Sequence, residues 1–260
     1  MWRLFASVVA GFAVGTLGGL IGLGGAEFRL PLLIGMFAFV ALEAVILNKA
    51  ISLIVVASAL AFRSSTIPFA SVASHWPIIA NLLAGSLLGA WLGADLATRL
   101  TANTLYRVIA VLLVLIAVVL LSTHDSHASG QPTAFGATMI IIGVAAGIAI
   151  GLIASLLGVA GGEFLIPTLV LLFGADIKLA GSLSLAISFP TMLVGFARYS
   201  RDRSFSVLRA NRAFVLTMAA GSIVGAFAGS SLLGHVPAAW LVPLLAAILF
   251  ASAIKVWRHR

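Results

Sequence analysis

The sequence predicts an all-α polytopic membrane protein built from two inverted-topology repeats. Three observations predict it: the composition, an internal duplication and the lengths of the apolar runs. Of the 260 residues, 62% are hydrophobic and only 8% are charged, which is too little polar surface for a soluble domain of this length. Mean hydropathy is +1.21. The lipid bilayer is therefore the expected surrounding of this chain.

The duplication has an offset of 136 residues. The segment GLGGAEF at 22–28 returns as GVAGGEF at 158–164, and a proline follows each copy three residues later, at Pro31 and Pro167. Such a repeat in an apolar chain is typical of transporters. The chain is therefore divided into an N-terminal transmembrane repeat, an extracytoplasmic linker and a C-terminal transmembrane repeat: 1–121, 122–136 and 137–260.

Each repeat is predicted to contain three long transmembrane helices plus a broken or re-entrant helix pair. The long apolar runs are 4–22, 77–98 and 103–121, with partners at 137–158, 212–233 and 238–256. The helix pairs lie at 26–62 and 162–198, and their first segments are short. Whether these pairs cross fully or re-enter stays open. Each half crosses an odd number of times either way, so its copy must be inverted.

The basic residues in the loops predict which side of the membrane is cytoplasmic. With the N-terminus inside, most basic residues fall in cytoplasmic segments: Arg3, Arg99, Arg107, Arg198, Arg201, Arg203, Arg209, Arg212, Lys255, Arg258 and Arg260. The segments predicted outside hold only Arg63. We therefore expect a multi-pass protein of the cell inner (plasma) membrane with both termini cytoplasmic. The basic pI is then a topology signal, and nucleic acid is not an expected partner.

Six glycines mark the expected binding site: Gly22, Gly24, Gly25, Gly158, Gly161 and Gly162. They are weak helix formers at the ends of apolar spans, just before a short helix whose early turns contain a proline. A helix break there exposes backbone N–H groups, and the N-terminus of a helix attracts anions. In inverted repeats the two breaks face each other near the midplane. The alternative is that the glycines only permit close helix packing.

Lys49 is the candidate for binding substrate charge. It lies near a predicted break, and its repeat equivalent is Leu185, so packing symmetry alone does not require a cation there. An ammonium inside the membrane is costly and tends to face a cavity, a counter-ion or a substrate. Alternatively, Lys49 snorkels to the interface or pairs with Glu43. Neutral donors in the same region complete the expected substrate site: Asn48, Ser52, Ser184 and Ser188.

Glu27 and Glu163 are acids at equivalent positions. Each could cap exposed amides at a helix N-terminus. The functional alternative is proton coupling, because a carboxyl removed from water can take up a proton and carry it. Arg29 could pair with Glu27, whereas Leu165 occupies the position equivalent to Arg29. Glu163 is therefore the better candidate for the proton carrier.

The paired glycine motif, with Pro31 and Pro167, resembles that of the sulfite exporter TauE/SafE family of membrane permeases, and the similarity covers both halves. The resemblance implies a multi-helix inner-membrane protein that moves small sulfur-containing or organic anions such as sulfite or sulfonates. The sequence departs from a full triple glycine, with Ala26 in one copy and Ala160 in the other. The backbone geometry at these two positions is therefore less certain.

The predicted function is that of a secondary transporter, and export is what the resemblance implies. Its partners would be a small anionic substrate, the bilayer and a coupling proton or other ion, since the chain has no Walker motif for ATP. No cofactor, metal or catalytic residue is expected. A passive anion channel remains an alternative, and an intramembrane enzyme is disfavoured because every histidine falls outside the predicted spans. Substrate identity, coupling stoichiometry, direction and oligomeric state stay open.

Overall fold

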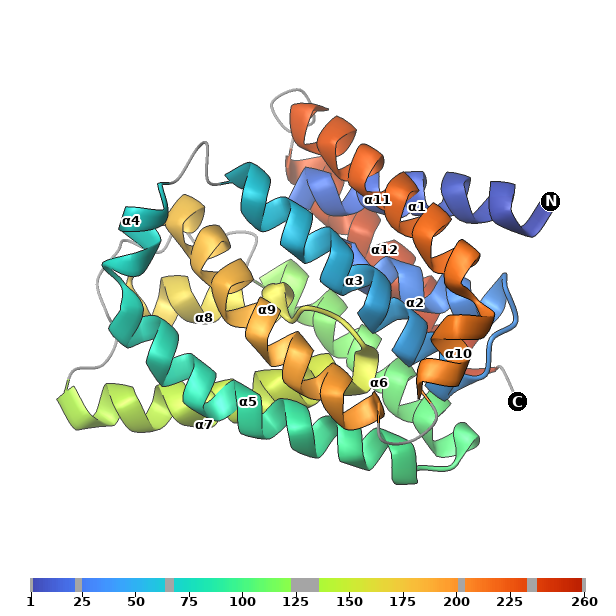
Figure 1. The fold of residues 1–260 in the computed structure, drawn as a ribbon. Coiled ribbons are helices and arrows are strands. Elements are labelled where there is room, and N and C mark those ends of the chain that lie inside the picture. Colours follow the sequence, from blue (N-terminus) through green and yellow to red (C-terminus); the bar gives the residue numbers. More distant parts are fainter. Residues whose placement is uncertain are drawn as a thin grey trace.

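The structure is a computed structural model that describes residues 2–21, 25–63, 68–122, 136–200, 204–232 and 238–258. Within these ranges the regular structure consists of helices alone (Figure 1). They are α1 Trp2–Ile21, α2 Ala26–Gly35, α3 Ala41–Arg63, α4 Phe69–Ala73, α5 Trp76–Arg99, α6 Ala102–Ser122, α7 Gly136–Leu157, α8 Gly162–Phe173, α9 Ile177–Ser200, α10 Ser204–Ala210, α11 Arg212–Leu232 and α12 Ala238–Trp257. The predicted all-α class is confirmed. Most of the predicted linker, 123–135, lies outside the described residues.

Seven of the described helices are long and apolar enough to cross a membrane: α1, α3, α5, α6, α7, α9 and α11. The polytopic prediction is therefore confirmed. The two short helices of the predicted pairs differ from these seven. Helix α2 has 10 residues and α8 has 12, so they extend only about 15 and 18 Å along their axes. Each is followed by a helix of spanning length, α3 or α9.

The two halves of the chain interlock through helices that touch along glycine stripes. Helix α1 lies on α11, and α5 lies on α7. A side chain at Gly15 of α1 would overlap the carbonyl of Ser222 in α11, and one at Gly151 of α7 would overlap the carbonyl of Ser86 in α5. These contacts are the same pair displaced by 136 residues. The repeats therefore pack across each other, with backbones in direct contact.

The other helix contacts follow the same symmetry, in which each helix is replaced by its equivalent 136 residues away. Helix α2 contacts α12 while α8 contacts α6, and α3 contacts α11 while α9 contacts α5. The short helices α4 and α10 likewise pack on α9 and α3. Exchanging the halves therefore maps these helix contacts onto one another, as expected for two copies of one unit.

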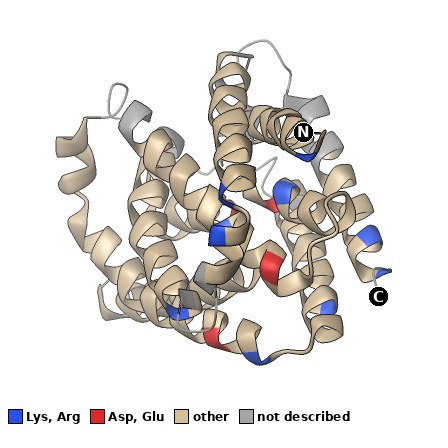
Figure 2. Cartoon of the chain, turned by 45° about the vertical axis from the view of Figure 1, so that its right-hand side comes forward, with Lys and Arg blue, Asp and Glu red and all other residues tan. Residues whose placement is uncertain are grey.

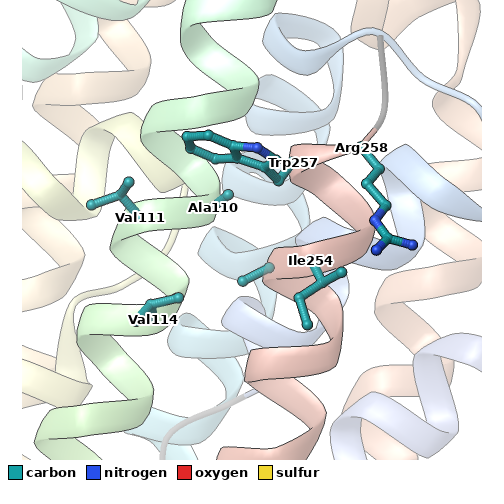
Figure 3. Close-up of a pocket in the computed structure, with 7 residues that line it drawn as sticks. Ala110, Val111, Val114, Ile254, Trp257 and Arg258 are labelled. Atoms are coloured by element: carbon teal, nitrogen blue, oxygen red, sulfur yellow. The ribbon is translucent and has the colours of Figure 1, made fainter.

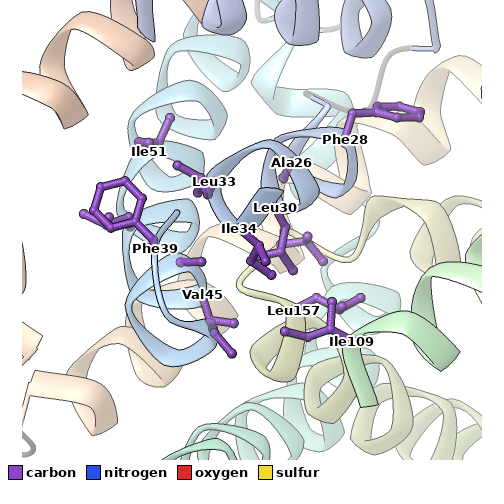
Figure 4. Close-up of a cluster of buried hydrophobic side chains, with 14 of the residues drawn as sticks. Ala26, Phe28, Leu30, Leu33, Ile34, Phe39, Val45, Ile51, Ile109 and Leu157 are labelled. Atoms are coloured by element: carbon purple, nitrogen blue, oxygen red, sulfur yellow. The ribbon is translucent and has the colours of Figure 1, made fainter. Parts of the chain in front are cut away.

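Helix α2 lies at the centre of the largest buried apolar cluster (Figure 4). Its residues Leu30, Leu33 and Ile34 are fully buried, and the cluster includes Ile109 of α6 and Leu157 of α7. Protein thus surrounds α2. An interrupted backbone is tolerated at membrane depth only where protein or a water-filled cavity shields it, and α2 meets the first condition.

Charged residues are sparse on these helices (Figure 2). Asp95 of α5 forms ion pairs with Arg99 at 2.7 Å and with Arg198 of α9 at 2.5 Å, which ties two helix ends predicted to be cytoplasmic. Arg3 donates a hydrogen bond to the carbonyl of Phe37 at 3.2 Å. The segment after α2 therefore returns to the level at which α1 begins.

Candidate functional site

Both predicted breaks coincide with interruptions of the helices. Helix α1 ends at Ile21 and α2 begins at Ala26, while α7 ends at Leu157 and α8 begins at Gly162. Gly22 and Gly24 lie outside the described residues. Three described glycines beside the helix starts and ends have left-handed backbone angles: Gly25 at φ 69°, Gly158 at φ 66° and Gly161 at φ 81°. Such angles favour glycine, which explains the residue type at these positions.

The first break lies partway along α1. A side chain at Gly25 would overlap the carbonyl of Val14, near the middle of α1, and α2 then returns toward the level of Arg3. At the equivalent place, a side chain at Gly161 would contact Ala154 and Ile150 of α7. Each short helix therefore begins beside the C-terminal half of the long helix that precedes it. This is the geometry of a re-entrant helix.

Asn48 of α3 bridges the two breaks. Its amide nitrogen donates to the carbonyl of Ala26 at 3.0 Å and to the carbonyl of Leu157 at 3.2 Å. Ala26 starts α2, and Leu157 ends α7. One side chain therefore reaches helix ends from both halves of the chain. The described glycines of the two breaks, Gly25, Gly158, Gly161 and Gly162, lie in one region around it.

Arg29 is fully buried and binds neutral groups. Its guanidinium donates to Asn48 Oδ1 at 3.3 Å, to Ser52 Oγ at 3.0 Å and to Ser222 Oγ of α11 at 3.4 Å. Arg29 also lies within electrostatic range of Glu27. The sequence interpretation treated Arg29 only as a partner of Glu27 and missed its role in joining α2, α3 and α11. Its position three residues after the start of an apolar helix was the available signal.

Lys49 is 1% exposed, in the interior of α3. Its ammonium donates to Ser155 Oγ at 2.8 Å and lies 5.5 Å from the centre of the Tyr199 ring. The Tyr199 hydroxyl donates to the carbonyl of Ser155 at 2.9 Å. A side chain at Gly195 would collide with the ammonium, so glycine makes room for it. Lys49 thus lies against α7 and α9 of the other half and does not reach the interface.

The break that Lys49 approaches is therefore the one after α7, close to Ser155, and α3 itself is continuous there. Within the described residues no ion pair joins Lys49 to Glu43 or to any other acid. The sequence analysis did not predict that Ser155, Gly195 and Tyr199 contact Lys49. Their surrounding sequence resembles an ordinary apolar helix, and the contact arises only from the packing of α3 on α7 and α9.

Glu27 and Glu163 approach each other from the first turns of α2 and α8. They are 1% and 8% exposed, and none of their four carboxyl oxygens has a hydrogen-bond partner among the described residues. The Glu27 carboxyl lies within electrostatic range of that of Glu163. The capping alternative stays a prediction, because the backbone N–H of Glu27 itself lies close to the Glu27 carboxyl. A pair of buried, facing carboxyls is suited to holding a proton.

The predicted hydroxyl donors divide into three cases. Ser52 accepts a hydrogen bond from Arg29, and Ser184 donates to the carbonyl of Gly181 in its own helix at 2.9 Å. Ser188 is 1% exposed, and its hydroxyl has no hydrogen-bond partner among the described residues. Ser188 thus retains its hydrogen-bonding capacity. Within the described part of the chain, no cluster of three His, Asp or Glu side chains could hold a metal ion.

A polytopic helical protein whose interrupted helices enclose a buried, charged centre has the construction of a membrane transport protein. The family model of the sulfite exporter TauE/SafE family matches residues 7–256, and the chain belongs to this family. The resemblance seen in the glycine motif is thereby confirmed. Membership implies a membrane permease for a small molecule. No curated protein and no solved structure matches the chain.

Proposed function

We propose that this protein is a secondary transporter that exports a small sulfur-containing or organic anion, such as sulfite or a sulfonate, by alternating access around its two helix breaks. The observation that carries the proposal is the environment of Lys49. Its ammonium is buried, and among the described residues it contacts the hydroxyl of Ser155 and the ring of Tyr199, both neutral, and forms no ion pair. A buried charge without a counter-ion is costly, and an anionic substrate would remove that cost.

Neutral groups at the two helix breaks would complete the proposed substrate site. The N-terminal turns of α2 and α8, after Gly25 and Gly161, present backbone N–H groups. Asn48 lies between the two breaks, and Ser188 has an unused hydroxyl. Sulfite and a sulfonate group each carry three oxygens that accept hydrogen bonds, so a site with one ammonium and several neutral donors is suited to them.

Burial of this centre favours a carrier over a channel. Lys49, Arg29 and Asn48 are at most 1% exposed, so in this conformation the polar centre is closed to solvent. A conducting channel would line a continuous aqueous path with such groups. A carrier instead passes through a closed state between two open ones. The exchange symmetry of the helix contacts supports two such open states, each reached by moving one half against the other.

The facing carboxyls of Glu27 and Glu163 would couple transport to the proton gradient. Two unpaired carboxylates inside the protein repel each other, and a single shared proton relieves the repulsion. Arg29 lies within electrostatic range of Glu27, so charge at the pair and charge at the substrate site influence each other. A proton bound at this pair would then move with the anion.

Counterflow in proteoliposomes tests the proposal. The wild-type protein should exchange labelled sulfite against internal sulfite with saturable kinetics. Lys49→Met keeps the volume of the side chain and removes the charge, and it should weaken sulfite binding roughly 10- to 100-fold, as expected for a charged hydrogen bond. Arg212→Met, on the exposed start of α11, is the matched control and should exchange sulfite normally.

Three results would overturn the proposal. Unchanged sulfite affinity in Lys49→Met would assign the lysine to packing. Flux that rises linearly with concentration and shows no counterflow would make the protein a channel. If sulfite is not exchanged by the wild type, sulfoacetate, thiosulfate, taurine and simple carboxylates are tested next, and failure of all of them would reject a small-anion carrier.

A further inference from the structure

A groove lies between α6 and α12, and none of the residues that line it belongs to the site above (Figure 3). It has a volume of about 460 Å³, within the range of small-ligand pockets. Ala110, Val111 and Val114 line it from α6, and Ile254, Trp257 and Arg258 line it from α12. Val111, Ile254 and Trp257 remain 57%, 56% and 51% exposed. An apolar concavity that stays this open on a membrane-spanning surface faces lipid.

The groove has one basic end and one apolar end. Trp257 and Arg258 lie at the end of α12, beside Ala110 and Val111, while Val114 and Ile254 lie further along (Figure 3). The guanidinium of Arg107, one turn before Ala110, lies 5.9 Å from the centre of the Trp257 ring. Arg107 therefore lies at the mouth beside Trp257, Arg258 extends from the same end of α12 (Figure 3), and the apolar floor of the groove runs on from there.

No ion pair among the described residues involves Arg107 or Arg258. The end of α12 and the start of α6 both belong to the side that the loop charges predict to be cytoplasmic. That leaflet holds the anionic phospholipids, and basic pockets between transmembrane helices on this side bind their head groups. Tryptophan is also typical of this depth.

We infer that the groove between α6 and α12 binds one anionic phospholipid of the cytoplasmic leaflet. Its phosphate lies between Arg107 and Arg258, and one acyl chain runs along Val111, Val114 and Ile254. The arginines provide charge complementarity at the head group, and the exposed apolar side chains provide contact for the chain. This site is separate from the substrate site and does not depend on the proposed transport function.

Quenching of Trp257 fluorescence tests the inference. Purified wild-type protein in mixed micelles is titrated with phosphatidylglycerol or phosphatidylcholine that carries brominated acyl chains, and the signal of Trp257→Phe is subtracted. Each basic residue near an anionic head group contributes roughly fivefold in affinity. Phosphatidylglycerol should therefore quench at a concentration roughly 5- to 25-fold lower than phosphatidylcholine.

Matched variants separate the head group from the chain. Arg107→Gln/Arg258→Gln should lose the preference for phosphatidylglycerol, and Arg209→Gln/Arg212→Gln, which removes the same charge from α10 and α11, should keep it. Val111→Phe fills the groove and should reduce quenching by both lipids. Leu115→Phe, exposed on α6 but outside the groove lining, should not.

The inference is overturned if Arg107→Gln/Arg258→Gln retains the wild-type preference while eluting and melting like the wild type. It is also overturned if neither brominated lipid quenches Trp257 and the protein elutes as a dimer that Val111→Phe dissociates. That second result would assign the groove to an interface between two copies of this chain.

Discussion

At the scale of single residues, the two halves share a backbone but differ in charge. Glu27 and Glu163 are equivalent and lie together, whereas Arg29 corresponds to Leu165 and Lys49 to Leu185. The cations therefore come from the first half alone. Among the described residues, Arg29 donates to the neutral side chains of Asn48, Ser52 and Ser222, and Lys49 donates to that of Ser155. This difference suggests that Arg29 organises the site while Lys49 has donors left for substrate.

Replacing Arg29 by lysine should destabilise the protein. The variant keeps the charge but cannot reach Asn48, Ser52 and Ser222 together, because an ammonium is a compact donor on a flexible stem. We expect loss of about 1–3 kcal/mol, measured as a lower melting temperature in detergent. Arg212→Lys, at an exposed position, is the control. Equal melting temperatures would mean that the three bonds contribute nothing.

Glu163→Gln should remove the pH dependence of transport. A glutamine at 163 is neutral at every pH and can donate a hydrogen bond to Glu27, so it imitates the pair with one proton bound. Sulfite exchange by the variant, measured between pH 5 and 8 in proteoliposomes, should be flat where the wild type varies. Glu43→Gln, on the first turn of α3, should retain the wild-type profile. A wild-type profile in Glu163→Gln would reject proton coupling at this pair.

At the scale of secondary-structure elements, the breaks depend on glycines with left-handed angles. Gly161 is the N-cap of α8 and has φ 81°, and its carbonyl accepts the first N–H bonds of the helix, from Phe164 at 3.1 Å and Leu165 at 2.9 Å. The left-handed angle of this residue therefore turns the chain into the first turn of α8. The prolines that follow the breaks lie within α2 and α8 and do not end them.

Gly161→Ala should impair both stability and transport. An alanine there adopts an unfavourable left-handed angle and contacts Ala154 and Ile150, so α8 must shift. The strain alone costs about 1–2 kcal/mol. Gly136→Ala is the matched control, because Gly136 also has a left-handed angle, φ 61°, but a side chain there would meet open space at the start of α7. Both variants should melt earlier, and only Gly161→Ala should lose sulfite affinity.

The comparison of Gly161→Ala with Gly136→Ala also tests whether the helix break is part of the substrate site. If the two alanine variants reduce sulfite affinity equally, the effect is one of stability, and the geometry of the break is not part of the site. If neither changes affinity, the packing alternative for the glycine clusters is the correct one.

At the scale of the whole molecule, periodic and repeated features were predictable and contacts between halves were not. The duplication and the apolar runs located the long helices within one or two residues, as for α5 and α6. The bonds of Asn48 to Leu157 and of Lys49 to Ser155 join residues more than 100 positions apart. No local pattern encodes such contacts. They arise only once α3 has packed against the end of α7.

The relative orientation of the two halves is the remaining prediction at this scale. Helix α1 runs parallel to α11, since Gly11, Gly15 and Gly19 face Met218, Ser222 and Ala226 in ascending order. Helices α5 and α7 are parallel for the same reason. In Figure 1 both termini lie at one end of the molecule. These features support an inverted arrangement, in which equivalent positions of the two repeats lie on opposite sides of the membrane.

Two single-cysteine variants test this arrangement, because the chain has no native cysteine. Ser74 follows α4, Ala210 ends α10, and the two positions are equivalent and exposed. A membrane-impermeant maleimide added to spheroplasts should label Ser74→Cys at once, and Ala210→Cys only after permeabilisation. Labelling of both without permeabilisation would place the repeats the same way up. If the repeats were not inverted, a swap of conformation between the two halves could not convert an inward-open form into an outward-open form.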